Sequence, residues 1–188
     1  MLKILYRKLY LDTIPQGERH LAEHEAAHDL LSEGLKRLNF PSMEVQYTDN
    51  GKPYFDGNPV YFSFSHSGGV VVCALADTLI GVDVEVIRPK KIDSIKRIAT
   101  RMFTMQEQKQ LMEHNYDVNV FYEIWVRKEA LVKRSGVGIT GMAEADSFSN
   151  TIISHRNDGF VLAVAKDPAE SLIIEVLSDV NSHKKSGF

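Results

Sequence analysis

The sequence is poor in cysteine, in long apolar runs and in excess charge of either sign. One cysteine, Cys73, among 188 residues excludes an internal disulfide and suits a reducing compartment. No segment approaches the roughly 20 apolar residues of a membrane span, and charges at positions 3, 7 and 8 interrupt the apolar start, unlike a signal peptide. A formal net charge of −3 argues against nucleic acid or an anionic membrane as the main partner. We therefore expect a cytoplasmic protein that binds neither nucleic acid nor membranes.

Apolar periodicity divides the chain into blocks of strands and helices. A strand over the opening ten residues precedes an amphipathic helix over about 18–38, which ends before Pro41. Strands are predicted near 45–48, 61–64, 70–76 and 79–86, helices over about 92–101, 105–114 and 119–134, and further strands near 147–154, 160–165 and 172–177. The tail, 181–188, is predicted to be disordered.

One stretch of sequence recurs in the second half of the chain. Ser65-His66, a short loop and the apolar run 70–77 are matched by Ser154-His155, a loop one residue longer and the run 160–167. Two apolar hairpins alike by chance are the alternative. A true repeat predicts an α+β protein of two pseudo-symmetric halves, 1–88 and 89–180, each with a helix packed on a small antiparallel sheet, and a cleft where they meet.

Two clusters of charged residues indicate phosphate chemistry. In the run 81–86, Asp83 and Glu85 would share one face of a strand, because side chains alternate. Glu129 and Lys133 would share one face of a helix at i and i+4. Three oxygen ligands and a lysine suit a divalent cation that grips phosphate oxygens. The alternative is a solvent-facing edge strand and an exposed ion pair worth about 0.2–0.5 kcal/mol.

Five short motifs occur in order between residues 51 and 133. They are Gly51-Lys52-Pro53, Phe64-Ser65-His66-Ser67, the run from Gly81 to Glu85, the run from Phe103 to Glu107, and the run from Trp125 to Lys133. Each is weak alone, but in this order the chain resembles the Sfp type of 4′-phosphopantetheinyl transferase. That resemblance implies the family's fold. It also implies transfer of the phosphopantetheine arm of coenzyme A to a serine of an apo acyl or peptidyl carrier protein, with release of adenosine 3′,5′-bisphosphate.

The resemblance also implies roles for individual residues. Asp83, Glu85 and Glu129 would hold Mg²⁺, with Mn²⁺ as an alternative, and Glu129 would accept the serine proton. Lys133 would contact phosphate as a point charge, making Glu129 and Lys133 the catalytic pair. Contacts with coenzyme A are expected from Lys52, Pro53, Ser65, His66, Lys128 and Lys133. Because two halves in one chain allow a complete site, we expect a monomer.

The helix over about 18–38 departs from the family pattern. Asp29 stands before Leu30-Leu31 where an arginine is expected, and Glu18, Glu23, Glu25 and Glu33 make the segment acidic. Many family members bind the 3′-phosphate of coenzyme A with basic residues around this helix. A catalytically silent relative that binds coenzyme A or a carrier protein therefore stays open as an alternative.

The same helix contains a match to a zinc-protease motif. His24-Glu25-Ala26-Ala27-His28 has the H-E-x-x-H spacing, which puts two histidines on one helix face beside a general base. His20 lies one turn earlier, and no extended zinc-protease signature follows. A third ligand would have to come from a residue such as Glu44, so a zinc protease is the less favoured alternative.

Overall fold

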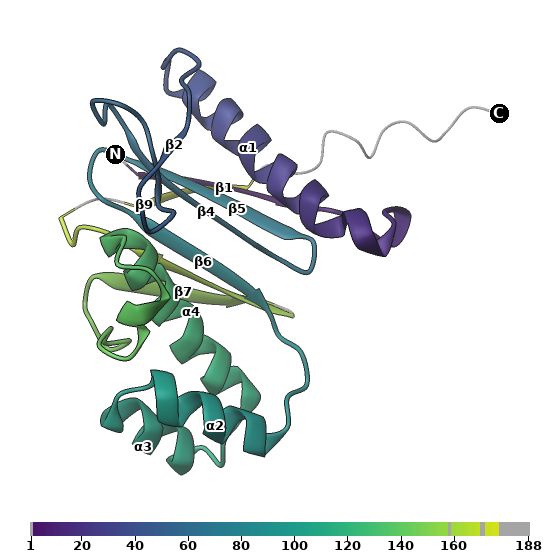
Figure 1. The fold of residues 1–188 in the computed structure, drawn as a ribbon, viewed down its shortest axis with the longest axis vertical. Helices are drawn as coiled ribbons and strands as arrows, with labels where there is room; N and C mark the ends of the chain where they lie inside the picture. Colours follow the sequence, from purple (N-terminus) through teal and green to yellow (C-terminus); the bar gives the residue numbers. More distant parts are fainter. Residues whose placement is uncertain (1, 158, 170–171, 177–188) are drawn as a thin grey trace.

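The computed structural model describes residues 2–157, 159–169 and 172–176, and Figure 1 shows them as two helix-covered sheets with a helical pair at one end. The predicted disordered tail, 181–188, lies outside this range. The elements are β1 (Leu2–Lys8), η1 (Leu11–Thr13), η2 (Gln16–Glu18), α1 (Arg19–Arg37), β2 (Gln46–Tyr47), β3 (Pro53–Tyr54), β4 (Tyr61–Ser67), β5 (Val70–Ala76), β6 (Gly81–Val86), α2 (Ile92–Met102), α3 (Met105–Glu113), α4 (Val118–Ser135), η3 (Ile139–Met142), β7 (Ile152–Asn157), β8 (Phe160–Ala165) and β9 (Leu172–Val176).

The first unit is a four-stranded sheet covered by α1. Its strand order is β4-β5-β1-β9, with β5 antiparallel to β4 and β1, and β9 parallel to β1. Ala27 and Leu30 lie on the buried face of α1 and share a core with Leu5 and Leu75 of the sheet. A Cβ atom at Gly34 would collide with the Leu75 side chain, so glycine lets α1 lie close against the sheet.

The second unit is a three-stranded antiparallel sheet covered by α4. Its strand order is β6-β8-β7, and Val126 and Ala130 of α4 share a core with Val161 and Ala163 of β8. A Cβ atom at Gly81 would collide with the backbone carbonyl of Ala130. Glycine at the start of β6 therefore lets α4 approach the strand that carries Asp83 and Glu85.

The two units repeat one arrangement, as the sequence predicted. In each, a helix covers an antiparallel hairpin, β4-β5 or β7-β8, and a third strand, β1 or β6, pairs with the second hairpin strand. The α+β fold of two pseudo-symmetric halves is thereby confirmed. A strand near 172–177 was predicted and is present as β9, but its parallel pairing with β1 was not predicted, because an apolar pattern does not reveal which strand it pairs with.

Strand pairing crosses the predicted boundary at residue 88. β6 lies before this boundary and pairs with β8, whereas β9 lies after it and pairs with β1. The predicted division of the chain into two halves, 1–88 and 89–180, therefore remains a prediction. The observed sheets show that each unit takes one strand from the other stretch of sequence.

Local signals fix the ends of the helices next to the second sheet. Thr104 and Glu107 form a reciprocal capping box at the start of α3, and the Asp117 carboxylate caps the start of α4. Gly136 ends α4 in a left-handed conformation with φ of 75°. The strand predicted near 147–154 begins later, at Ile152, because residues 147–151 turn instead. In the described part of the chain, no helix is long and apolar enough to cross a membrane.

Candidate active site

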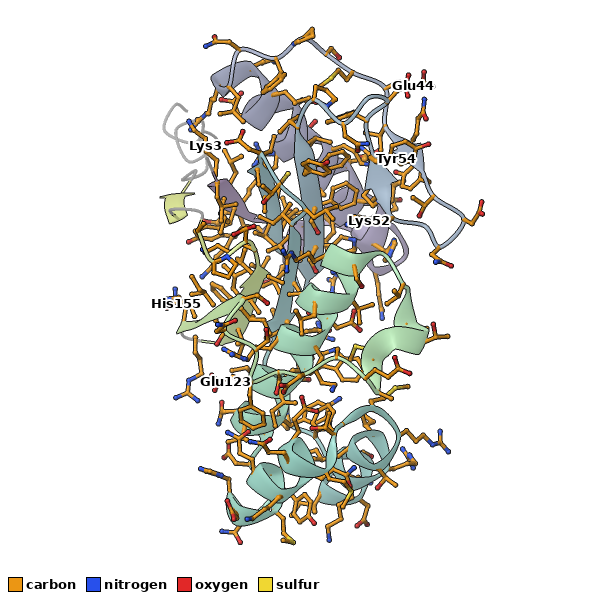
Figure 2. All side chains as sticks on the ribbon, turned by 90° about the vertical axis from the view of Figure 1, so that its left-hand side faces the viewer. Lys3, Glu44, Lys52, Tyr54, Glu123 and His155 are labelled. Carbon is orange, nitrogen blue, oxygen red and sulfur yellow. The ribbon has the colours of Figure 1, made fainter. Side chains whose placement is uncertain are left out.

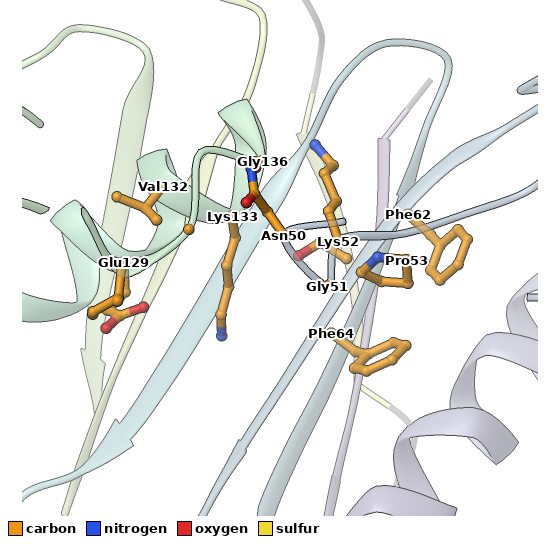
Figure 3. A pocket seen from close by; sticks show the side chains of 13 residues that line it. Asn50, Gly51, Lys52, Pro53, Phe62, Phe64, Glu129, Val132, Lys133 and Gly136 are labelled. Carbon is orange, nitrogen blue, oxygen red and sulfur yellow. The ribbon is translucent and has the colours of Figure 1, made fainter. Parts of the chain in front are cut away.

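A cavity of about 260 Å³ lies where the first unit meets the end of α4. Figure 3 shows its walls, which come from the turn at Asn50–Pro53, from Phe62 and Phe64 of β4, and from Glu129, Val132 and Lys133 of α4. Gly136, Gly138 and Ile139 complete the rim after α4. The predicted residues Lys52, Pro53, Glu129 and Lys133 therefore line one cavity, although they lie up to 81 positions apart in sequence (133 − 52).

Asp83 lies buried on β6 next to this cavity. Its Oδ1 accepts a hydrogen bond from Lys133 Nζ at 2.7 Å and another from Ser65 Oγ at 2.8 Å. Its Oδ2 is also buried but has no hydrogen-bond partner among the described residues. A buried carboxylate oxygen without a partner is costly and marks a position where a ligand can bind.

The carboxyl groups of Glu85 and Glu129 lie near Asp83. Glu85 Oε2 accepts a hydrogen bond from Ser67 Oγ at 2.7 Å. Burial raises the pKa of Glu85 above its usual value, and the negative charge of Asp83 acts in the same direction. Burial also raises the pKa of Glu129, as do the charges of Asp83 and then Glu85, against the opposing effect of Lys133. Glu85 and Glu129 thus lie within electrostatic reach of Asp83, which is the carboxylate that Lys133 contacts directly.

We call the carboxylates of Asp83, Glu85 and Glu129 the acidic group. Their chemistry suits a divalent cation better than their present arrangement does. Carboxylate oxygens are the ligands that Mg²⁺ prefers, and Asp83 Oδ2 is available to bind one. Within the described ranges, however, no three histidine, cysteine, aspartate or glutamate side chains are grouped so that they could hold a metal ion. The Lys133 ammonium instead neutralises Asp83. The donor set thus fits Mg²⁺, and the carboxylates still have to converge on it.

Ser65 connects the lysine and the aspartate. Its hydroxyl accepts from Lys133 Nζ at 2.9 Å and donates to Asp83 Oδ1. Ser65 Oγ also accepts from the backbone N–H of Val84, at an N···O distance of 3.4 Å. The Ser65 hydroxyl is therefore fully engaged by protein groups, so a contact with coenzyme A would require it to exchange one of them.

Lys52 joins the turn of the first unit to the end of α4. Its ammonium donates to the Arg134 carbonyl, and Asn50 Nδ2 donates to the Gly136 carbonyl at 3.2 Å. Burial lowers the pKa of Lys52, and the charge of Arg134 adds to this. Figure 2 shows Lys52 at the junction of the units, and Figure 3 shows its side chain beside Gly136. Lys52 and Pro53 thus line the cavity, while the lysine charge faces the helix end, where cations are favoured.

His66 faces α1, on the other side of β4 from Ser65. Its Nδ1 lies 3.2 Å from Glu23 Oε2, and its ring lies 5.1 Å from the ring of His20. Burial lowers the pKa of His66, although Glu23 raises it. Glu23 is itself buried and also accepts from the backbone N–H of Gly69 at 2.6 Å. The sequence marked Glu23 only as part of an acidic helix, because an ion pair 43 positions apart (66 − 23) leaves no local signal.

Lys128 has a different environment from the one that the family resemblance implied. Both Lys128 and Glu107 have 0% side-chain exposure, and Lys128 Nζ lies 2.7 Å from Glu107 Oε2. The ammonium also donates to the Ala145 carbonyl and lies 5.8 Å from the centre of the Phe103 ring. The predicted contact between Lys128 and coenzyme A therefore finds no support in this geometry. Its visible role is to hold α3, α4 and the following loop together.

The zinc-protease motif does not assemble a metal centre in the described residues. The rings of His24 and His28 lie 4.6 Å apart on one face of α1, as the spacing predicts. His28 Nε2 is buried without a hydrogen-bond partner among the described groups, and its ring packs 5.2 Å from that of Phe64. No third ligand joins the pair to form a metal-binding group within the part of the chain that the structure describes. We therefore interpret this stripe as a packing surface between α1 and β4.

Comparisons with known proteins identify one family for this chain. Residues 79–181 match the model of the 4′-phosphopantetheinyl transferase superfamily. The chain is 36% identical over 137 residues to the 4′-phosphopantetheinyl transferase AcpT of Salmonella typhi. The aligned region covers 71% of this chain and 68% of that protein. A 4′-phosphopantetheinyl transferase of Bacillus subtilis is 34% identical over 137 residues, with 71% and 57% covered. The transferase Sfp of Bacillus subtilis strain 168 is 35% identical over 116 residues, with 60% and 49% covered.

The matched region contains the elements that form the acidic side of the site. It begins before β6 and includes α4, so Asp83, Glu85, Glu129 and Lys133 all fall inside it. The motifs at residues 51–67 lie before it and are placed next to it by the fold. Motifs, fold and relatives therefore lead to one conclusion: the chain belongs to the 4′-phosphopantetheinyl transferase superfamily.

Proposed function

We propose that this protein transfers the 4′-phosphopantetheine arm of coenzyme A to a serine of an apo acyl or peptidyl carrier protein. The reaction depends on Mg²⁺, which Mn²⁺ can replace, and releases adenosine 3′,5′-bisphosphate. The observation that carries the proposal is the ion pair of the buried Asp83 with Lys133, with Glu85 and Glu129 within its electrostatic reach, beside a cavity between the two units. Family membership supplies the reaction class, and this arrangement supplies charged groups suited to it.

The reaction exchanges one phosphorus–oxygen bond for another. The serine hydroxyl attacks the phosphorus that bears the pantetheine arm and loses its proton, while the bond from that phosphorus to the oxygen of the adenosine bisphosphate breaks. The pyrophosphate and the leaving adenosine bisphosphate carry dense negative charge, so catalysis depends mainly on positioning and charge neutralisation. The site needs a proton acceptor near the serine and cations near the pyrophosphate.

The residues at the cavity meet these needs. Glu129 lines the cavity and accepts the serine proton, a role that suits the raised pKa of its carboxyl group. Lys133, one helical turn further, supplies a positive charge to the phosphate oxygens. Asp83, Glu85 and Glu129 would hold the divalent cation, which neutralises charge on the pyrophosphate when it is bound.

Coenzyme A would lie along the cavity towards the first unit. Lys52 and Pro53 form its wall there, and Ser65 and His66 belong to the adjacent strand. Lys52 is bonded to the end of α4 and would contact a phosphate by turning its ammonium inward. A complete site in one chain supports a monomer, and the single cysteine suits the reducing cytoplasm.

Two contacts made by acidic residues of α1 favour a second candidate, a relative that binds coenzyme A without transferring its arm. The Glu23 carboxylate sits against His66, where a phosphate would otherwise be attracted. Within the same helix, Asp29 pairs with Arg7 at 3.7 Å and further reduces the positive charge available. Both contacts reduce the positive charge available to a phosphate near α1, and neither involves Asp83, Glu85 or Glu129.

Mass spectrometry of apo carrier proteins distinguishes the two candidates. A panel of fatty-acid, polyketide and nonribosomal-peptide carriers is incubated with the protein, coenzyme A and Mg²⁺, with EDTA as the matched control. A gain of the phosphopantetheine arm that EDTA prevents supports the transferase. Binding of coenzyme A by calorimetry, with no gain on any carrier, supports the silent relative. Glu129→Gln serves as the inactive control, because it retains side-chain volume and hydrogen bonding but cannot accept the proton.

A further inference from the structure

Three serines join the two sheets along neighbouring edge strands. β4 is an edge strand of the first sheet, and β6 is an edge strand of the second. Ser63, Ser65 and Ser67 of β4 accept hydrogen bonds from the backbone N–H groups of residues 82, 84 and 86 of β6, with N···O distances of 3.1, 3.4 and 3.2 Å. We call these three contacts the serine ladder. It connects the sheets through hydroxyl groups in place of backbone carbonyls.

The serine ladder follows from the period of a β-strand. Alternate side chains of β4 point the same way, so three serines at i, i+2 and i+4 all reach β6. Alternate N–H groups of β6 point away from β8, and both strands advance by about 3.3 Å per residue, so the two sets stay in step. A hydroxyl group that accepts from an N–H still has one proton to donate.

Two of these hydroxyl protons go to the carboxylates of the candidate metal site. Ser65 Oγ donates to Asp83 Oδ1 at 2.8 Å, and Ser67 Oγ donates to Glu85 Oε2 at 2.7 Å. Ser63 has the same backbone bond but, within the described residues, no bond to a carboxylate. Ser65 also contacts Lys133. Of the three serines, Ser67 is therefore the one whose side chain bonds to a carboxylate but not to Lys133.

We propose that Ser67 is a positioning residue, whose hydroxyl keeps the Glu85 carboxylate on the Asp83 side of β6, where the carboxylates would converge on the divalent cation. The Glu85 side chain has three rotatable bonds, and the bond from Ser67 restricts them before the cation arrives. Groups that hydrogen-bond to a metal ligand typically change metal affinity by about 10–100-fold when they are removed. The inference rests on the proposed function, because it concerns the cation of the transfer reaction.

Direct binding of Mn²⁺ tests this role without relying on turnover. Free Mn²⁺ is measured by electron paramagnetic resonance during titration of the protein without coenzyme A or carrier. Ser67→Ala is expected to raise the Kd for Mn²⁺ about tenfold, and Ser67→Thr, which keeps a hydroxyl, is expected to restore it to near the wild-type value. If the alanine variant does not fold, Ser67→Cys replaces it, because a thiol keeps the volume but is a weak donor.

Ser63→Ala is the matched control. It removes the same type of backbone bond, from Val82, without releasing a carboxylate. Its loss of stability in urea should therefore resemble that of Ser67→Ala, while its Kd for Mn²⁺ stays at the wild-type value. In transfer assays, Ser67→Ala should need more Mg²⁺ but keep the wild-type KM for coenzyme A at saturating Mg²⁺.

A double-mutant cycle identifies Glu85 as the residue through which Ser67 acts. In a Glu85→Ala background, Ser67→Ala should cause no further loss of Mn²⁺ affinity. The proposal is overturned if Ser67→Ala binds Mn²⁺ as tightly as the wild type, or if Ser63→Ala weakens binding equally. A wild-type protein that neither binds Mn²⁺ nor transfers the arm overturns the proposed function as well. A wild type that does both, beside an unaffected Ser67→Ala, overturns the positioning role alone.

Discussion

Replacing Lys128 by methionine tests whether this lysine is a structural or a ligand-binding residue. Lys128 and Glu107 are both fully buried, and their charged atoms lie 2.7 Å apart. Methionine keeps most of the volume of lysine but removes the charge and the donated hydrogen bonds. Glu107 would then be left as a buried anion without its cation, and the Ala145 carbonyl would lose its donor.

The expected loss of stability follows from the fate of Glu107. Removal of one partner from a buried ion pair typically costs about 3–5 kcal/mol. Glu107 keeps two other donors, the backbone N–H groups of Thr104 and Ser147, at 2.7 and 2.8 Å. These bonds still stabilise its charge, so we expect a loss near the lower end, about 3 kcal/mol.

Urea denaturation followed by the fluorescence of Trp125, the single tryptophan, measures this loss. The second variant, Lys128→Met with Glu107→Gln, should recover at least half of it, because a neutral amide needs no buried counter-charge. The KM for coenzyme A, measured where both proteins are folded, should not change. A loss below about 1 kcal/mol would refute the reasoning, and a raised KM with normal stability would mean that Lys128 reaches the coenzyme after all.

Further predictions concern the carboxylates at the cavity, the partly buried imidazole of His66 and the cysteine. Glu129→Gln should lower kcat by at least about 100-fold with an unchanged circular dichroism spectrum; retained turnover would remove its role as base. Asp83→Ala should raise the Mg²⁺ concentration for half-maximal rate, and an unchanged requirement would argue against ligation. Burial lowers the pKa of His66, so the unfolded chain binds more protons below about pH 6.5 and the free energy of unfolding should fall there. His66→Asn should flatten this fall in urea titrations at several pH values; an identical slope would contradict it. Burial raises the pKa of the Cys73 thiol, so a disulfide reagent should modify it only on unfolding, and rapid labelling of the native protein would be inconsistent with its burial.

The sequence was sufficient to predict which residues share a face. Alternation along β6 put Asp83 and Glu85 on one side, and the i, i+4 spacing put Glu129 and Lys133 together on α4. Both hold in the structure, and the Asp83–Lys133 contact joins the two elements. These features follow from local geometry, which periodicity describes directly.

The partners of charged groups were not accessible from the sequence in the same way. Lys128 and Glu129 are adjacent, but successive helical residues point about 100° apart, so one is buried against Glu107 and the other lines the cavity. Similarly, Lys52 has the expected position, yet its ammonium bonds to a carbonyl of α4 that only tertiary folding brings near. Family motifs identify such residues without stating which way their side chains point.

The serine ladder has a consequence for how separate molecules meet. A strand at the border of a sheet offers unpaired N–H and C=O groups to which a strand of a neighbouring molecule can add, leading to aggregation. The N–H groups of Val82, Val84 and Val86 on that side of β6 already donate to serine hydroxyls. This protein can thus keep carboxylates on a border strand next to a ligand cavity while leaving few backbone donors on that strand for intermolecular sheet growth.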